Sequence, residues 1–427
     1  MTTENPTESK AASPSASKAA APSAGTVLSL MMTRFRRGDS GMIPIVAGLI
    51  IMAIYFEARS SAFLTVGNLT NLAIQASIFV ILGMAEVWLL LLGEIDLSAG
   101  FTAGLGGAIA VVLVDLQFHW PWWAAIGISL LATVAIGALW GLLVITLRLP
   151  SFIVTLAGQF GLEGCLIWLV DSQGTGGTIT VHETVLYNIV YGNLTPLFTW
   201  IFIGGTVALL VFSMVRKNAS RAAQDLESQP ILILGIKVVS MVAAGVIAAV
   251  VFNTNRGEHN GAFNLTIVGM PYAIVLVGAV LAAYTFILNK TKAGRYIYAI
   301  GGNTEAARRA GIAVNRYRLL AFMLTGLTAG IAGLVYVSQL NGVQDGINGG
   351  NLVLYAVASA VIGGTSLFGG RGKMMHALIG GFVIGTIYNG LALLQFPAAQ
   401  QYIATALVLL AAVTIDSLAR RGSTIVK

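Results

Sequence analysis

The sequence predicts an all-α, polytopic membrane protein that forms one bundle of about 12 transmembrane helices, or about 10 at the least. Charged residues make up 10% of the 427 residues, whereas about a quarter of an ordinary soluble protein is charged. Hydrophobic residues make up 56%, and the mean hydropathy is +0.84. The 50 glycines are spread through the apolar stretches and do not form one linker. A long, glycine-rich and charge-poor chain is typical of a multi-span membrane protein.

The first 40 residues differ in composition from the rest of the chain. Residues 1–40 begin Met-Thr-Thr-Glu-Asn-Pro and continue through alternating Ala, Ser, Pro and Lys, and such a segment has too little apolar surface to offset the entropy of ordering. We therefore expect residues 1–40 to form a disordered cytoplasmic tail and residues 41–427 to form the transmembrane domain.

Twelve apolar runs follow the tail, and a spanning helix needs about 20 residues. The runs cover residues 41–56, 69–92, 97–114, 122–147, 151–170, 194–215, 231–252, 265–288, 319–340, 352–368, 374–396 and 402–415. The first, tenth and last runs are short for a span, so the number of spans depends most on them.

The basic residues predict an even number of spans with both termini in the cytoplasm. With this topology 22 of the 24 Lys and Arg residues fall on the inside, and only Arg59 and Arg256 fall on the outside. Cytoplasmic loops of membrane proteins carry such an excess of basic residues. The opposite side carries Trp120, Trp122 and Trp123, as expected for aromatic residues at a membrane interface.

The loop at residues 289–318 is the longest basic connection between spans on the predicted inner side. Its centre predicts a short surface helix, because it has polar caps, an acidic first turn, a basic last turn and a closing glycine. In that order these residues are Asn303 and Thr304, Glu305, Arg308 and Arg309, and Gly311. Ala306, Ala307 and Ala310 are small enough to allow close approach of another protein. Capping alone does not distinguish a docking helix from a solvated connector.

Several carboxylates lie within or between apolar runs, where an unpaired charge is costly. Asp96, which precedes Ser98, can cap the third span, or it can belong to the translocation pathway or a gate, and the two roles can coexist. Glu86 and Glu163 lie deeper in their runs, where they can bond to a neighbouring helix or contact a polar solute. The candidate pathway or gate residues are Gly93, Glu94, Asp96, Ser98, Glu86 and Glu163.

Other classes of function lack support in the sequence. The net charge of +7 comes from basic residues that flank apolar runs, which does not indicate a nucleic-acid partner. The glycine-rich stretch before Lys373 is followed by Met374 and does not fit a phosphate-binding loop, so we expect no ATP hydrolysis by this chain alone. No Cys/His cluster indicates a metal site, and no motif indicates a catalytic residue.

Three stretches, taken together, resemble one family. Residues 299–312 are similar to the coupling-helix loop of the sugar-type ATP-binding-cassette (ABC) importer permeases, the ribose, xylose and galactose group. Residues 93–100, Gly-Glu-Ile-Asp-Leu-Ser-Ala-Gly, resemble that family's Gly-Gly-Ile-Asp-Leu-Ser-Val-Gly signature, and residues 363–372 resemble its C-terminal signature. The resemblance runs in the expected order from about residue 69 to the C-terminus. It departs at Glu94, where the family usually has glycine.

The resemblance implies a permease subunit of an importer for a monosaccharide in a bacterial inner membrane. It implies three protein partners: an ABC ATPase subunit, an external sugar-binding protein and a second copy of the permease. ATP and magnesium would bind the ATPase, so this chain would carry no cofactor, and its other contact would be membrane lipid. The extra length, which comes from the enlarged region at residues 171–252 and the long tail, resembles the xylose permeases most, and the sugar expected from this resemblance is xylose.

Two other functions remain open from the sequence. One is an ion-coupled secondary transporter, in which Glu86, Glu94 or Asp96 would be the coupling carboxylate. The other is an ABC permease of the same superfamily for amino acids or nucleosides.

Overall fold

The computed structural model describes residues 43–115, 118–173, 176–224, 226, 229–257, 259–260, 263–264, 266–346, 349–397, 399–404, 406–407, 410 and 414. The predicted tail at residues 1–40 and part of the last apolar run lie outside these residues. Eleven of the twelve predicted apolar runs coincide with a helix, because an apolar segment in lipid must satisfy its backbone hydrogen bonds internally.

Within the described residues, eight helices are long and apolar enough to cross a membrane. They are α3 (Val66–Leu90), α5 (Trp122–Leu147), α6 (Ser151–Asp171), α8 (Pro196–Ala222), α9 (Ile231–Asn253), α10 (Tyr272–Lys290), α13 (Val314–Leu340) and α15 (Met374–Leu393). The helices α2 (Ile43–Arg59), α4 (Ala99–Asp115) and α14 (Gly349–Ile362) are shorter. This arrangement confirms the predicted polytopic all-α fold, while the number of 12 spans stays a prediction.

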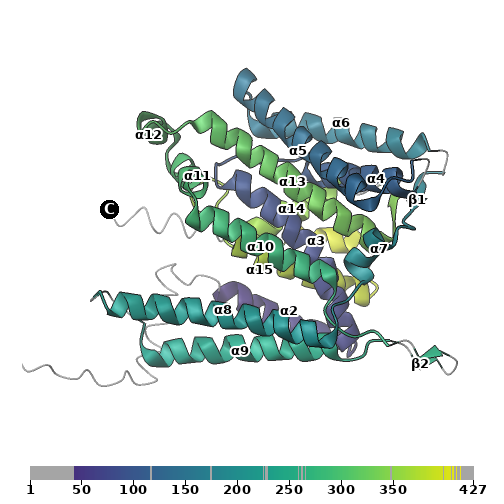
Figure 1. Cartoon of the computed structure of the whole chain (residues 1–427), viewed down its shortest axis with the longest axis vertical. Helices are drawn as coiled ribbons and strands as arrows, with labels where there is room; N and C mark the ends of the chain where they lie inside the picture. The colour runs from purple at the N-terminus through teal and green to yellow at the C-terminus, as the bar shows by residue number, and fades with distance from the viewer. Residues whose placement is uncertain are drawn as a thin grey trace, which may run out of the picture. The chain divides into compact units, whose positions relative to one another are not determined.

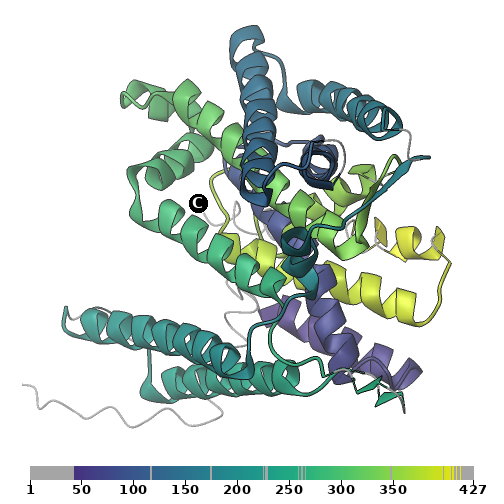
Figure 2. The same cartoon turned by 45° about the vertical axis from the view of Figure 1, so that its right-hand side comes forward.

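Helices α3 and α13 occupy the centre of the bundle (Figure 1, Figure 2). Most of α3 is buried, and it packs against α13, α14 and α15. Glycines allow the close approach of these helices, as is common in membrane bundles. A Cβ added to Gly107 of α4 would overlap Val337 and would lie 2.8 Å from the carbonyl oxygen of Gly333, both in α13. Glycines such as Gly107, Gly137 and Gly381 are thus contact points between helices, whereas others in the apolar runs, such as Gly127 and Gly204, have open space around them.

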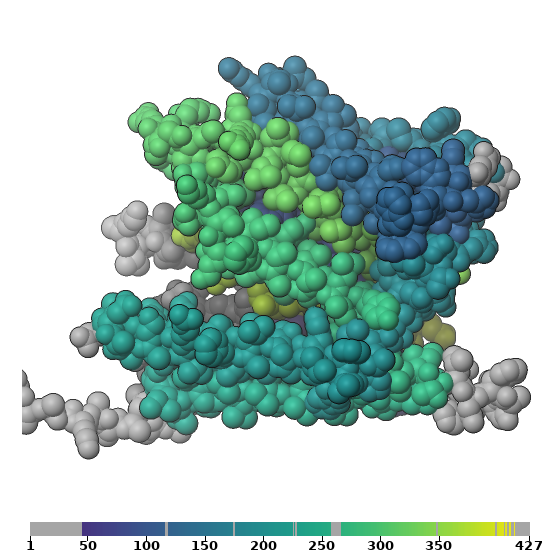
Figure 3. Space-filling model, in the orientation of Figure 1, coloured from purple at the N-terminus to yellow at the C-terminus, as the bar shows by residue number. Residues whose placement is uncertain are grey.

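Helices α8 and α9 form a peripheral pair that packs together at the edge of the bundle (Figure 3). Almost none of their apolar surface is buried in the chain. Phe252 at the end of α9 joins the pair to the bundle through Met270 and Ala73 of α3. The pair lies largely within the region that looked enlarged in the sequence.

Short elements connect the helices. Strand β1 (Thr178–Thr180) pairs antiparallel with β4 (Gly342–Gln344), and β2 (His259–Asn260) pairs with β3 (Phe263–Asn264). Helices α7 (Thr184–Tyr191), α11 (Lys292–Gly302) and α12 (Thr304–Arg309) are too short to span a membrane. The last two lie in the loop at residues 289–318, which leads to the candidate site.

Candidate functional site

The short surface helix predicted in the 289–318 loop is present as α12. The side-chain Oδ1 of Asn303 accepts a hydrogen bond of 2.9 Å from the backbone N–H of Ala306 and so caps the helix. At the other end, the N–H of Gly311 bonds to the carbonyl of Arg308 and the N–H of Ile312 to that of Ala307. This bonding pattern closes a helix when the residue after its end is left-handed, and Gly311 has φ +80°. The predicted caps are confirmed, except that the hydroxyl of Thr304 bonds back to Ile300.

One side of α12 is turned away from the chain. Glu305, Ala306, Arg309 and Ala310 are exposed, whereas Ala307 is buried against the protein's own core. Ala307 therefore belongs to the packing that holds α12 in place, and Ala306 and Ala310 are the small residues left for a partner.

The charges of α12 partly neutralise one another. Glu305 and Arg308 form an ion pair of 2.5 Å between exposed side chains. Arg309 also lies in the last turn, where a positive charge complements the helix dipole. The role of these residues in coupling to an ATPase stays a prediction.

The three stretches that carry the family resemblance meet at one point, which we call the glycine junction: Gly93, Gly301, Gly302, Gly369 and Gly370. The N–H of Gly370 donates a 2.9 Å hydrogen bond to the carbonyl of Leu91, just beyond the end of α3. A Cβ added to Gly301 would overlap that same carbonyl oxygen and would lie 2.7 Å from the nitrogen of Gly370. Backbone from residues far apart in the sequence is thus in direct contact here.

Backbone conformation also requires glycine at the junction. Gly93 has φ +77° and Gly370 has φ +72°, a region that residues with a Cβ rarely adopt. Tyr298 of α11 adds a side-chain tie, because its hydroxyl donates a 2.7 Å hydrogen bond to the carbonyl of Gly372. Burial raises the pKa of Tyr298 above its usual value.

The segment between α3 and α4 is irregular, and α6 holds its backbone in place. The hydroxyl of Ser151 accepts from the N–H of Ile95 at 3.2 Å, and the hydroxyl of Thr155 accepts from the N–H of Leu97 at 3.0 Å. Non-helical backbone inside a membrane protein needs such partners. The segment is therefore fixed against α6 on one side and against the glycine junction on the other.

The prediction that Asp96 caps the third span by accepting from its free amides is wrong, because the side chain bonds to the residue before the helix instead. Its Oδ1 accepts from both the N–H of Ser98, at 2.8 Å, and the hydroxyl of Ser98, at 2.6 Å, and α4 begins at the next residue. Glu86 lies behind it, and the N–H of Asp96 approaches the Oε2 of Glu86 at 3.5 Å. Both carboxyls are buried. The structure thus brings together three of the candidate pathway or gate residues in the protein interior.

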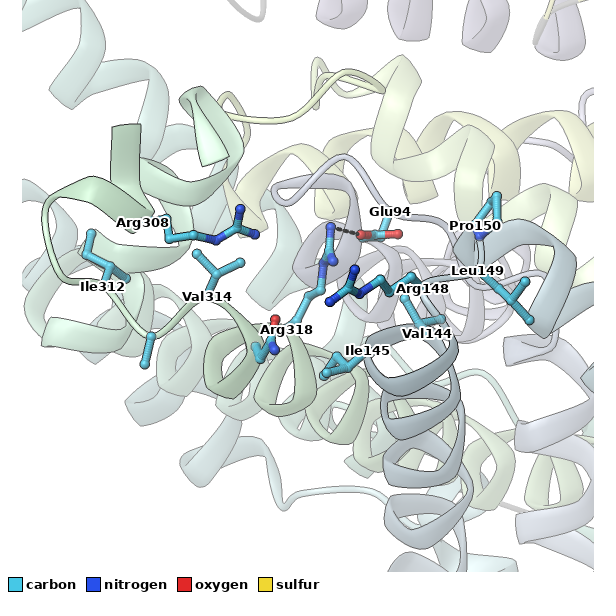
Figure 4. Close-up of a pocket in the computed structure, with 12 residues that line it drawn as sticks. Glu94, Val144, Ile145, Arg148, Leu149, Pro150, Arg308, Ile312, Val314 and Arg318 are labelled. Carbon is cyan, nitrogen blue, oxygen red and sulfur yellow. Dashed lines mark ion pairs between the residues drawn. The ribbon is translucent and has the colours of Figure 1, made fainter. Parts of the chain in front are cut away.

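Glu94 points in a different direction from Asp96. Its Oε1 forms a 2.8 Å ion pair with Arg318 near the start of α13 (Figure 4). The pair lies on the wall of an open cavity of about 950 Å³, which Arg148 and Arg308 also line. Glu94 therefore links the α3–α4 segment to the helix that follows α12. Glu163 lies half-buried on α6 and is not part of the junction or of this cavity.

The sequence reasoning missed Arg318, Arg148 and Tyr298 as site residues. Glu94 signalled that a cation was needed, because a carboxylate among apolar residues is costly when unpaired. The long basic loop offers several cations, however, and nothing in the sequence selects Arg318 from them.

The described residues form a bundle of apolar helices, several of them long enough to cross a membrane, with a surface loop tied to the centre of the bundle. This arrangement is that of a polytopic membrane protein. The chain belongs to the family described as branched-chain amino acid transport system / permease component, whose model matches residues 68–413. The matched range includes all three stretches that meet at the glycine junction.

Individual relatives cover nearly the whole chain. The chain is 34% identical to the xylose transport system permease protein XylH of Escherichia coli K12, over 89% of this chain and 92% of that protein. It is 32% identical to the XylH protein of Haemophilus influenzae, over 88% and 95%. It is 29% identical to the ribose import permease protein RbsC of E. coli K12, over 87% and 92%. No solved structure matches the chain.

Proposed function

We propose that this chain is the membrane-spanning permease subunit of an ATP-driven ABC importer for a monosaccharide, a pentose such as xylose. The observation that carries the proposal is the glycine junction, which joins the exposed short helix α12, through α11, to the end of the central helix α3. The similarity of the chain to xylose and ribose permeases supports the same assignment. The protein would lie in a bacterial inner membrane, with both termini and α12 in the cytoplasm.

The partners follow from this assignment. An ABC ATPase subunit, which would bind ATP and magnesium, would grip the exposed side of α12. An external sugar-binding protein would deliver the sugar to the opposite face. A second copy of the permease would complete the pathway, and lipid would cover the exposed apolar helices.

The contacts suggest how movement of α12 would reach the pathway. Helix α11 precedes α12 directly, and Gly301 at its end packs against the carbonyl of Leu91. A shift of α12 would move this contact and with it the segment between α3 and α4. Because α3 packs against α13, α14 and α15, the shift would pass into the centre of the bundle. The close packing makes the junction a stiff link, since it has no space in which to absorb the motion.

A matched pair of variants tests the coupling. Ala306→Trp places a bulky side chain on the exposed side of α12, so we expect a permease that folds but has lost sugar-stimulated ATP hydrolysis by the reconstituted complex. Ala307→Trp places the same bulk in the core, so we expect loss of folded protein. Normal stimulated hydrolysis in the Ala306 variant would count against α12 as the coupling helix.

One observation favours a second candidate, an ion-coupled secondary transporter. The Oε1 of Glu86 is buried and has no hydrogen-bond partner among the described residues, and such a carboxyl inside a bundle can bind a proton or cation. A secondary transporter would move its substrate without an ATPase, whereas an ABC permease would not. Reconstitution of the chain alone in liposomes therefore distinguishes the two functions.

A further inference from the structure

A second cavity, of about 350 Å³, lies between α3, α13, α14 and α15. Its volume falls within the range of about 300–1,000 Å³ that is usual for small-molecule sites. We call it the outer aromatic cavity and define it by Phe79, Tyr336, Gln339, Tyr355 and Tyr388, with Gln75 and Asn351 at its wall.

The outer aromatic cavity lies away from the glycine junction. Tyr388 is 14 residues beyond Met374, where α15 begins close to the junction, a distance of about 21 Å along a helix. Tyr336 is 22 residues beyond Val314, where α13 begins after α12, or about 33 Å. The cavity therefore lies in the half of the bundle that the basic residues predict to face outward.

The rings of the cavity hold one another in place. Phe79 packs edge-on against Tyr355 with ring centroids 5.2 Å apart, and against Tyr388 at 5.7 Å. Such edge-to-face pairs are favourable, so the aromatic wall is ordered before a ligand arrives. Aromatic rings offer flat apolar surfaces that match the C–H faces of a sugar ring.

Polar groups of the cavity can serve hydroxyl groups. Amide side chains both donate and accept hydrogen bonds, and phenol groups do the same, which suits a ligand with a hydroxyl on nearly every carbon. The Oε1 of Gln339 is buried and has no hydrogen-bond partner among the described residues. A buried acceptor without a partner is costly. Gln339 borders the cavity, so a rotation of its amide toward the cavity would let a sugar hydroxyl satisfy this acceptor.

The charge of the cavity separates a sugar from an amino acid. None of the described residues that line it is Asp, Glu, Lys, Arg or His. An amino acid would bring a carboxylate and an ammonium group into this space with no countercharge, and burying such charges unpaired is unfavourable. A neutral polyol carries no such penalty.

We propose that the outer aromatic cavity is the site at which this permease contacts its transported sugar, with Tyr388 and Tyr336 as ring-stacking residues and Gln339 as a hydroxyl acceptor. This inference rests on the proposed function. It places the substrate contact on neutral aromatic and amide side chains, apart from Glu86, Glu94, Asp96 and Glu163.

The test uses the complete complex in proteoliposomes, with the ATPase, the sugar-binding protein and radiolabelled xylose. We expect Tyr388→Leu and Gln339→Leu each to lower the uptake per assembled permease at least fivefold, while Tyr388→Phe, which keeps the ring, retains most of it. The control is Tyr272→Leu, because Tyr272 is 42% exposed and Tyr388 is 38% exposed, but Tyr272 does not line the cavity. This control should transport like the wild type.

The outcomes separate the two claims. Wild-type uptake in assembled Tyr388→Leu and Gln339→Leu complexes would overturn the cavity assignment and leave the importer function intact. A wild-type complex that transports an amino acid but no sugar would overturn both. If Tyr388→Leu does not assemble, the comparison of Gln339→Leu with the wild type decides the question, since that substitution keeps a similar volume.

Discussion

Replacing Gly301 with alanine tests the glycine junction, and the neighbouring Gly302 provides a control. A Cβ on Gly301 would overlap the carbonyl oxygen of Leu91 and crowd the nitrogen of Gly370, which together form a 2.9 Å hydrogen bond. Overpacking costs about 1–3 kcal/mol, and a weakened hydrogen bond adds about 0.5–1.5 kcal/mol. We expect Gly301→Ala to destabilise the protein by about 2–4 kcal/mol.

Gly302→Ala should have the opposite sign or no effect. No atom lies within 4 Å of a Cβ placed on Gly302, and the residue is exposed. Alanine in place of glycine at a compatible position stabilises a protein by about 0.4–1 kcal/mol, because the unfolded chain loses freedom. Two adjacent and chemically identical substitutions should therefore differ in their effect on stability.

The assay is the midpoint of thermal unfolding of each purified variant in one detergent. We expect the midpoint of Gly301→Ala to fall by roughly 2–4 °C for a chain of this length, and that of Gly302→Ala to equal or exceed the wild type. Equal midpoints for the two variants, or a wild-type midpoint for Gly301→Ala, would refute the close contact between α11 and the segment after α3.

Two further predictions concern topology and the buried carboxylate. The topology is tested in a Cys165→Ser background, which removes the exposed native thiol. A membrane-impermeant thiol reagent should label the Thr178→Cys variant in intact cells and leave the Ala306→Cys variant unlabelled. Equal labelling of the two variants would contradict the topology. Asp96→Asn should keep near wild-type uptake, because an amide oxygen can also accept from Ser98. Asp96→Ala removes both hydrogen bonds to Ser98 and should lower stability by about 1–3 kcal/mol. A strong loss of uptake in an assembled Asn variant would instead place the charge in the pathway.

Local features of the fold could be read from the sequence. Apolar runs mark helices because lipid leaves the backbone no other partner, and the caps of α12 involve residues within a few positions of one another. Asn303 and Gly311 could therefore be assigned correctly without a structure.

Long-range contacts could not be read in the same way. The meeting of Gly301 with Leu91 and Gly370 joins segments separated by some 70 to 210 positions in the sequence, and no local pattern encodes it. The inward direction of Ala307 was hidden for a related reason, since three alanines on a short helix look alike until the rest of the chain covers one of them.

Faces of apolar helices are also hard to assign from sequence. In a membrane both the lipid-facing and the buried side of a helix are apolar, so Tyr336 and Tyr388 gave no signal that they border one cavity.

The role of Arg256 could not be read from the sequence either, because this basic residue lies on the predicted outer side, against the positive-inside rule. Its guanidinium donates hydrogen bonds to the carbonyls of Phe252 and Gly269. The side chain therefore holds together the two ends of the loop between α9 and α10.

The most direct test of the account is xylose uptake by proteoliposomes that contain this chain with or without its ATPase. With the xylose-loaded binding protein outside and ATP with magnesium inside, the account predicts accumulation of xylose that requires the ATPase and persists when ionophores abolish the proton and sodium gradients. Uptake by the chain alone that follows an ion gradient, or transport of another solute with no transport of a sugar, would contradict it.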